Sequence, residues 1–179
     1  MKSLLEKYGL LIWIAGAIII LDQWTKWLIR SNLPGGATWL PGWLDWLSPY
    51  ARLVNWHNTG AAFGMFQGGS MVFTVLAFVV VGAIVYYFPQ VDRKDVYLRI
   101  ALSMQLAGAI GNLIDRLTQN GRVTDFISVG NFPVFNVADS SISVGTAVLL
   151  LGVYLQERAA RKVKMNSGDS GQASEATSE

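Results

Sequence analysis

Two aspartates stand in apolar surroundings without an adjacent cation. Asp125 lies inside the apolar stretch Val123–Val129, and Asp139 lies about one turn into an apolar segment. Two carboxylates held close together do not both ionise cheaply, so one stays protonated and polarises a carbonyl while the other takes a proton from water. This pair therefore favours an amide hydrolase of the aspartic type.

The composition excludes several other kinds of chemistry. The chain contains no cysteine, which rules out a thiol nucleophile and a disulfide framework, and it contains one histidine, His57. A single histidine builds neither a credible serine triad nor a His-rich metal site, and we interpret His57 as an exposed loop residue rather than a general base. We expect no metal and no cofactor. The net charge of +2 is scattered over segment ends, which argues against nucleic-acid binding.

Further polar residues recur with helical spacing inside the apolar segments. Three pairs have this spacing: Asp22 with Lys26, Asn112 with Arg116, and Asn136 with Asp139. Residues three or four positions apart share one helical face, and Gly108 continues the face of Asn112 by one turn. Ionisable groups at bilayer depth are costly, so they usually face a bundle interior. The three polar stripes are predicted to converge on one cavity.

Each of these features also has a simpler interpretation. Asp22 and Lys26 serve equally well as a structural ion pair, and Asp115 beside Arg116 serves as a local charge pair or a helix end. Gly108 permits close helix packing without any further role. Intramembrane Asp and Lys also mark proton relays, so a small proton- or ion-coupled carrier is the alternative function. A scaffold subunit is a third interpretation, but it leaves Asp125 unexplained.

The elements that must position these residues are membrane helices. Of the 179 residues, 52% are apolar and 15% are charged, which is too little charge for a soluble domain of this size. Four apolar segments approach the roughly 20 residues that a helix needs to cross a bilayer. They cover approximately residues 9–29, 70–88, 97–117 and 134–155. The sequence predicts an all-α membrane protein with four transmembrane helices in one domain, residues 1–165.

The distribution of basic residues predicts the orientation. Nine of the 14 Lys and Arg residues flank the N-terminus, the second connection and the end of the fourth segment. By the positive-inside rule both termini are cytoplasmic, and the first and third connections face outward. The Trp-rich first connection, residues 30–69, is expected to be ordered and to contain a short strand around Ala51–His57. The polar composition of residues 166–179 predicts a disordered, dispensable cytoplasmic tail.

Five sequence blocks in a fixed order carry a family resemblance. They are Asp22-Gln-Trp-Thr-Lys26, Asn58-Thr-Gly-Ala-Ala-Phe-Gly64, Gly111-Asn-Leu-Ile-Asp-Arg116, Val123-Thr-Asp-Phe-Ile127 and Phe135-Asn-Val-Ala-Asp139. With this order and four helices, the chain closely resembles the lipoprotein signal peptidase (signal peptidase II) family of bacterial membrane aspartic proteases.

The resemblance implies an activity and a set of site residues. Members of the family cut prolipoproteins on the amino side of a diacylglyceryl-modified cysteine, and their catalytic aspartates correspond to Asp125 and Asp139. The supporting residues correspond to Asp22, Lys26, Asn58, Gly60, Ala62, Gly108, Asn112, Asp115, Arg116, Asn136 and Ala138.

The resemblance also implies an environment. It places the chain in the bacterial cytoplasmic (inner) membrane, with the site near the periplasmic face. It implies a small β-like cradle and an interfacial helix in the first outward connection. Inhibitors of the globomycin type are expected to bind the site, and the chain is expected to work among membrane lipids as a monomer.

Overall fold

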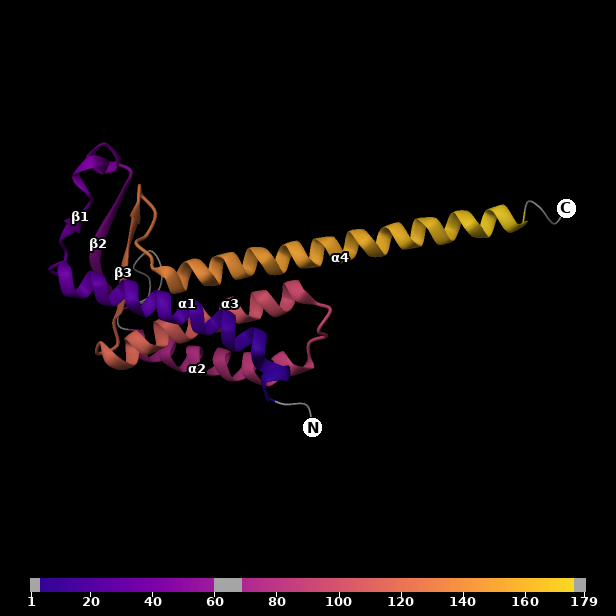
Figure 1. The fold of residues 1–179 in the computed structure, drawn as a ribbon, viewed down its shortest axis with the longest axis horizontal. Helices are drawn as coiled ribbons and strands as arrows, with labels where there is room; N and C mark the ends of the chain where they lie inside the picture. The colour runs from indigo at the N-terminus through magenta and orange to yellow at the C-terminus, as the bar shows by residue number, and fades with distance from the viewer. Residues whose placement is uncertain (1–3, 60–68, 176–179) are drawn as a thin grey trace.

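Four long helices form the body of the protein. The computed structural model describes residues 4–59 and 69–175, with side chains as far as Arg161. The helices are α1 (Leu4–Asn32), α2 (Ser70–Tyr87), α3 (Val96–Thr118) and α4 (Val137–Glu175), and a short 3-10 turn, η3 (Phe88–Gln90), follows α2 (Figure 1). All four are long and apolar enough to cross a membrane. The prediction of four membrane-spanning helices is confirmed, and the chain is a multi-pass membrane protein.

Helix α3 lies at the centre of the bundle. It packs against α1, α2 and α4, and it is the most buried of the four spans. The outward faces of the other helices carry large apolar side chains, such as Trp13, Met71 and Leu150, which are exposed because no protein covers them. A soluble protein avoids such a surface, whereas a bilayer solvates it.

A small antiparallel sheet lies across one end of the helices, which we call the sheet end (Figure 1). Its strand order is β1 (Thr38–Trp39), β2 (Ala51–Asn58), β3 (Val123–Val129). The strand predicted around residues 51–57 is therefore present as β2. Between β1 and β2 lies a short 3-10 helix, η1 (Gly42–Leu47), which corresponds to the additional helix expected in this connection. Strand β3 was not predicted, and it joins the third connection to the first.

The segment after β3 leads directly into the site. Gly130 has a φ of +51°, a backbone conformation that favours glycine, and the chain turns back there. Phe135 then forms an isolated bridge with Ile127, accepting backbone hydrogen bonds from Phe126 and Ile127. This bridge holds the start of α4 beside β3. Asp125 and Asp139 are therefore brought together by backbone pairing rather than by their own side chains.

Helix α4 extends into the residues that the sequence analysis assigned to the tail. The helix continues to Glu175 and projects beyond the other three helices (Figure 1), whereas the composition predicts disorder from residue 166. Helical hydrogen bonds join residues four apart, so a helix can continue without a neighbouring element. The dispensability of the tail stays a prediction.

Candidate active site

The N-terminus of α4 fixes Asp139 through a reciprocal pair of hydrogen bonds. Asn136 Oδ1 accepts from the backbone N–H of Asp139 at 2.9 Å, and Asp139 Oδ2 accepts from the backbone N–H of Asn136 at 3.2 Å. This pattern is a capping box, with aspartate in the place usually taken by glutamate. It holds the Asp139 carboxylate at the positive end of the helix dipole.

Asp125 is held by side-chain amides. Asn136 Nδ2 donates to its Oδ1 at 2.7 Å, and Asn58 Nδ2, at the end of β2, donates to its Oδ2 at 3.0 Å. The residue is 2% exposed. Burial, together with repulsion from Asp139, raises the pKa of Asp125 from 3.8 to about 7, although the two amide hydrogen bonds act in the opposite direction. Asp125 therefore titrates near neutral pH.

Asn112 on α3 connects Asp139 to a buried cation. Its Nδ2 donates to Asp139 Oδ1 at 2.7 Å. Its Oδ1 accepts from Lys26 Nζ at 3.0 Å and from Asn136 Nδ2 at 3.1 Å. The predicted convergence of three polar stripes is therefore observed, with α1, α3 and α4 each contributing one.

The expected Asp22–Lys26 ion pair is present and completely buried. Lys26 Nζ lies 2.9 Å from Asp22 Oδ2 and 3.5 Å from Asp115 Oδ2, and all three side chains are 0% exposed. Asp22 Oδ1 also accepts from the backbone N–H of Ala138 at 2.9 Å, which ties α1 to the first turn of α4. Ala138 is itself fully buried.

Asp115 lies near the end of α3, as one alternative of its simpler interpretation held, and its described ion-pair partners are Lys26 and Arg30 rather than Arg116. Arg30 NH1 lies 3.4 Å from Asp115 Oδ1, and the backbone N–H of Thr124 donates to Asp115 Oδ2 at 2.8 Å. Adjacent residues of a helix point about 100° apart, so Asp115 faces α1 and β3. The Arg116 guanidinium instead lies 5.6 Å from the centre of the Phe73 ring.

Two glycines let the helices approach closely enough for these contacts. A Cβ on Gly108 would lie 2.4 Å from Ile142 Cγ1 and 2.5 Å from the Ala138 carbonyl oxygen. A Cβ on Gly111 would lie 2.7 Å from Asp22 Oδ2. Gly108 is therefore a packing residue, as its simpler interpretation held.

A cavity of about 660 Å³ lies next to the two carboxylates. Its polar lining is Asn58, Asn112, Arg116, Asp125, Asp139, Ser140 and Ser143, and its apolar lining comes from Val123, α2, α4 and residues 132–135. In a second cavity of about 440 Å³, between the end of α1 and the sheet, none of the described lining residues is ionisable. The described lining therefore offers acid–base chemistry in the first cavity.

Two of the predicted site residues, Gly60 and Ala62, lie outside the described residues. His57 is exposed, as expected, but it belongs to strand β2 rather than to a loop, and it does not line the carboxylate cavity.

Two residues with site contacts were not singled out. Arg30 is four positions after Lys26 on the same helical face, a signal that was available in the sequence. Gln23 Nε2 contacts the Gly111 carbonyl oxygen at 3.0 Å and Asp22 Oδ2 at 3.1 Å, which only the fold reveals.

Comparison with known proteins decides the family. A family model described as signal peptidase (SPase) II matches residues 14–155. The chain belongs to the signal peptidase II family. It is 40% identical to a lipoprotein signal peptidase of Halalkalibacterium halodurans over 155 residues, which cover 84% of this chain and 96% of the relative. It is 37% identical to that of Enterococcus faecalis over 168 residues, covering 92% and 98%.

Solved structures agree with this family membership. A bacterial membrane enzyme solved at 2.3 Å by the in meso method superposes with a TM-score of 0.75 at 30% identity, covering 83% of this chain and 90% of that chain. A second, solved at 1.9 Å, gives a TM-score of 0.70 at 31% identity, covering 81% and 92%. The chain is therefore a membrane signal peptidase and a hydrolase, and the carrier interpretation is not favoured.

Proposed function

We propose that the chain is an aspartic endopeptidase in which Asp125 and Asp139 form the catalytic pair. One observation carries the proposal: these are the two acidic side chains of the cavity lining, and Asn136 contacts both of them. Within the described part of the chain neither carboxylate has a cation within 4.0 Å. Structural carboxylates such as Asp22 and Asp115 do have one.

The proposed reaction needs only water and the two carboxylates. The ionised carboxylate takes a proton from water while the water oxygen attacks the scissile carbonyl carbon, and the protonated carboxyl donates to the carbonyl oxygen. The tetrahedral intermediate then collapses: the C–N bond breaks, the carboxyl that took the proton from water donates it to the leaving nitrogen, and the hydroxyl of the former carbonyl returns its proton to the other carboxylate. Arg116 lines the same cavity, where its charge can stabilise the developing oxyanion.

The proposed substrate is a prolipoprotein, cut on the amino side of its diacylglyceryl-modified cysteine. The curated relatives are named lipoprotein signal peptidases, which supports this substrate class. The cavity mixes carboxylates with apolar side chains of membrane-spanning helices, including Phe73 of α2 and Ile142 of α4. A substrate whose acyl chains stay in the bilayer needs such a site, because its peptide bond must reach water while its lipid does not.

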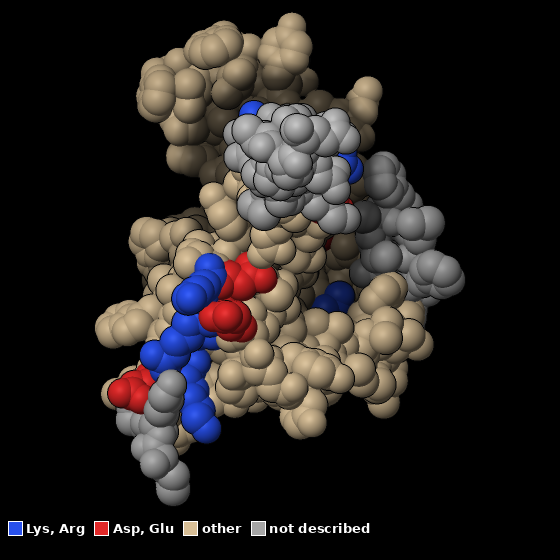
Figure 2. Space-filling model, turned by 90° about the vertical axis from the view of Figure 1, so that its right-hand side faces the viewer, with Lys and Arg blue, Asp and Glu red and all other residues tan. Residues whose placement is uncertain are grey.

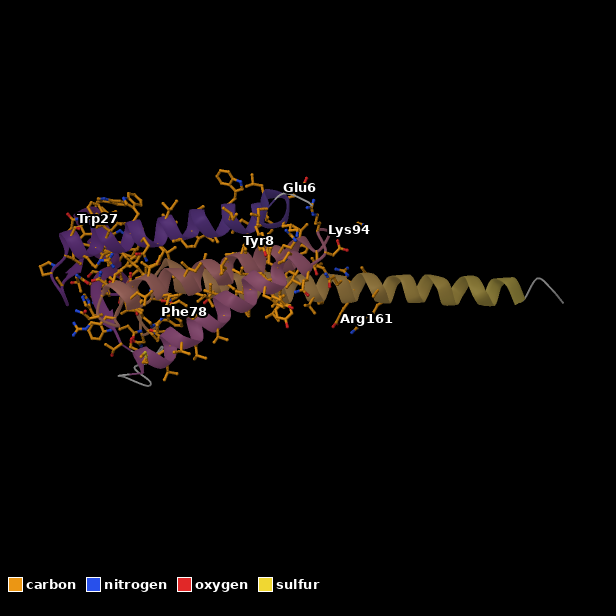
Figure 3. All side chains as sticks on the ribbon, turned by 90° about the horizontal axis from the view of Figure 1, so that it is seen from below. Glu6, Tyr8, Trp27, Phe78, Lys94 and Arg161 are labelled. Carbon is orange, nitrogen blue, oxygen red and sulfur yellow. The ribbon has the colours of Figure 1, made fainter. Side chains whose placement is uncertain are left out.

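We further propose the bacterial inner membrane as the location, with both termini cytoplasmic and the site near the periplasmic face. Arg93 donates to the Glu6 carbonyl and Arg99 to the Lys7 carbonyl, so the second connection and the N-terminus lie at one end. Figure 2 faces this end and shows Lys and Arg gathered on it. In Figure 3, Glu6 and Lys94 lie at the end opposite Trp27. The positive-inside rule assigns the basic end to the cytoplasm.

The proposal extends to inhibitors and assembly. Cyclic depsipeptides of the globomycin type are proposed to occupy the carboxylate cavity, which the family resemblance supports. Membrane lipids are proposed to surround the exposed apolar faces of the helices. The chain is also proposed to work as a monomer.

Cleavage of a defined substrate tests the proposal. The purified chain should convert a diacylglyceryl-modified prolipoprotein into a product whose new N-terminus is the modified cysteine, as located by mass spectrometry. The same prolipoprotein without its diacylglyceryl group is the substrate control and should stay uncut. Cleavage at another bond, or equal cleavage of both substrates, would overturn the substrate assignment. Full turnover by Asp125→Asn or Asp139→Asn would overturn the catalytic pair.

A further inference from the structure

The orientation of the Asn112 side-chain amide bears on which of the two catalytic carboxylates is ionised and which is protonated. Asn112 presents its oxygen to Lys26 Nζ and Asn136 Nδ2, and its nitrogen to Asp139 Oδ1. Turning this amide over would place its NH₂ against two other donors and its oxygen against a carboxylate. Because an ammonium group only donates, Lys26 fixes which end of Asn112 faces Asp139.

We infer that Lys26 is a positioning residue for the reaction: through Asn112 it directs an N–H donor onto Asp139 and makes Asp139 the ionised member of the pair, leaving Asp125 as the protonated member. This inference rests on the proposed function. It assigns to each aspartate a role that the resemblance leaves open.

The surroundings of Asp139 support this division. The charged groups that act on it are Lys26 and Asp22 from α1, Arg116 from α3, and Asp125 from β3. Asp22 and Asp115 are already paired, with Lys26 and Arg30 respectively. The capping box adds the positive end of α4. The hydrogen bonds from Asn112 and Asn136 and the charge of Lys26 favour a negative charge on Asp139, whereas burial and Asp22 oppose it.

The surroundings of Asp125 favour the proton. Its two described donors are neutral side-chain amides, from Asn58 and Asn136, whereas Asp139 also accepts from a backbone N–H of the α4 capping box. It is 2% exposed, and burial disfavours its charged form. Its raised pKa of about 7 fits a carboxyl that keeps its proton below neutral pH while the neighbouring carboxylate is ionised.

Three variants separate a positioning role from a structural one. Asp22→Asn alone keeps the ammonium on Asn112. The double variant Asp22→Asn, Lys26→Met removes the ammonium group and leaves no unpaired buried carboxylate at position 22. Asp22→Asn with Lys26→Gln restores an N–H donor without restoring the charge. Cleavage of the lipid-modified prolipoprotein is measured for each variant as kcat and KM across pH.

The Met variant should show a kcat about a hundredfold below that of Asp22→Asn, with KM changed by less than about threefold, because Asp139 loses its oriented donor. The acidic limb of its activity profile should move to higher pH. The sign follows because a nearby cation stabilises the singly ionised pair, and its removal makes that ionisation harder. The Gln variant should recover at least about tenfold of the lost kcat.

The opposite results would overturn the inference. If Lys26 only anchors α1, the Met variant will lose thermal stability, yet its folded fraction will show the kcat and acidic limb of Asp22→Asn. Should the Met variant fail to fold, Asn112→Leu, which leaves the Asp22–Lys26 pair intact, must give the same shift of the acidic limb, and an unshifted limb rejects the inference. Failure of the proposed function is distinguishable, because Asp125→Asn and Asp139→Asn would then remain active.

Discussion

At the residue scale, the amide groups of Asn112 and Asn136 link the carboxylates of the site. Asn136 contacts both aspartates, and Asn112 contacts Asp139, Asn136 and Lys26. Amides suit this position because each has a donor end and an acceptor end, so they hold two carboxylates close without neutralising either. A lysine in the same place would suppress the proton sharing that the proposed reaction requires.

The first prediction concerns the coupling of the two carboxylates. Asp125→Asn and Asp139→Asn should each lower kcat by at least about a thousandfold, and the double variant should be scarcely worse, because groups that act as one unit are not additive. The matched control is Asp45→Asn, an exposed aspartate in η1, which should keep wild-type turnover. Additive losses in the double variant would show two independent roles.

The second prediction concerns the pH dependence of stability. The pKa of Asp125 is 3.8 in an unperturbed carboxyl and about 7 in the fold, so between these values the folded protein holds a proton that the unfolded chain has released. The free energy of unfolding should therefore fall as the pH rises from about 4 to about 7. Asp125→Asn should remove this part of the decline in thermal unfolding experiments in detergent. Identical slopes in wild type and variant would contradict the burial of an acid at this position.

Helical spacing made most of these residues predictable, and spatial contacts account for the rest. Asp22, Lys26, Asn112 and Asp139 follow from the i,i+3 and i,i+4 rule, because a helix fixes which residues share a face. The partners of Asp115 did not follow, because they lie on α1 and β3. The amide directions of Asn112 and Asn136 are likewise invisible in a sequence, since they depend on donors from three elements.

At the element scale, strand β3 is the element that was not predicted from the sequence. Five of its seven residues are buried, on both faces, so Val123–Val129 lacks the alternation of buried and exposed residues that identifies a strand. The partner strand β2 lies some 70 residues earlier and belongs to a different connection. A pairing between strands this far apart in the sequence depends on the whole fold, so neither segment alone predicts it. The family resemblance implied a β-like cradle in the first connection, but it implied no strand in the third connection.

The third prediction tests the close contact of α3 with α4. Gly108→Ala should lower the thermal stability and the activity together, because its Cβ would lie 2.5 Å from the Ala138 carbonyl oxygen and would push Asn112 away from Asp139. The matched control is Gly82→Ala in α2, where no atom of the described residues lies within 4 Å of the new Cβ. Alanine is the better helix former, so this control should be neutral or stabilising by up to about 1 kcal/mol. Equal effects of the two substitutions would refute the packing argument.

At the scale of the whole molecule, the two ends of the bundle differ in chemistry. The apolar core includes Leu11, Phe88 and Leu106 and lies toward the start of α1, away from the sheet. The buried ion pairs and the carboxylate cavity lie at the sheet end. A carrier requires polar groups along a path through the membrane, whereas a peptidase requires them at one depth. The observed arrangement matches the second requirement.

The fourth prediction concerns the end of α4. A chain that stops after Met165 should keep wild-type activity and thermal stability, because residues 166–179 contain too little apolar surface to dock on the bundle. The measurements are prolipoprotein cleavage and the midpoint of thermal unfolding in detergent. A loss in either quantity would show that the tail makes contacts that its composition does not suggest.

The last prediction concerns orientation, and the absence of cysteine makes it simple to test. His57→Cys and Lys94→Cys place single thiols at exposed positions at the two ends of the bundle. On intact cells a membrane-impermeant thiol reagent should label position 57 but not position 94, because the basic end belongs in the cytoplasm. Ala77→Cys, buried within α2, is the control and should stay unlabelled before and after lysis. Lysis should expose position 94. Labelling of position 94 alone on intact cells would reverse the orientation, and it would place the carboxylate cavity on the cytoplasmic side, where secreted prolipoproteins do not present their cleavage site.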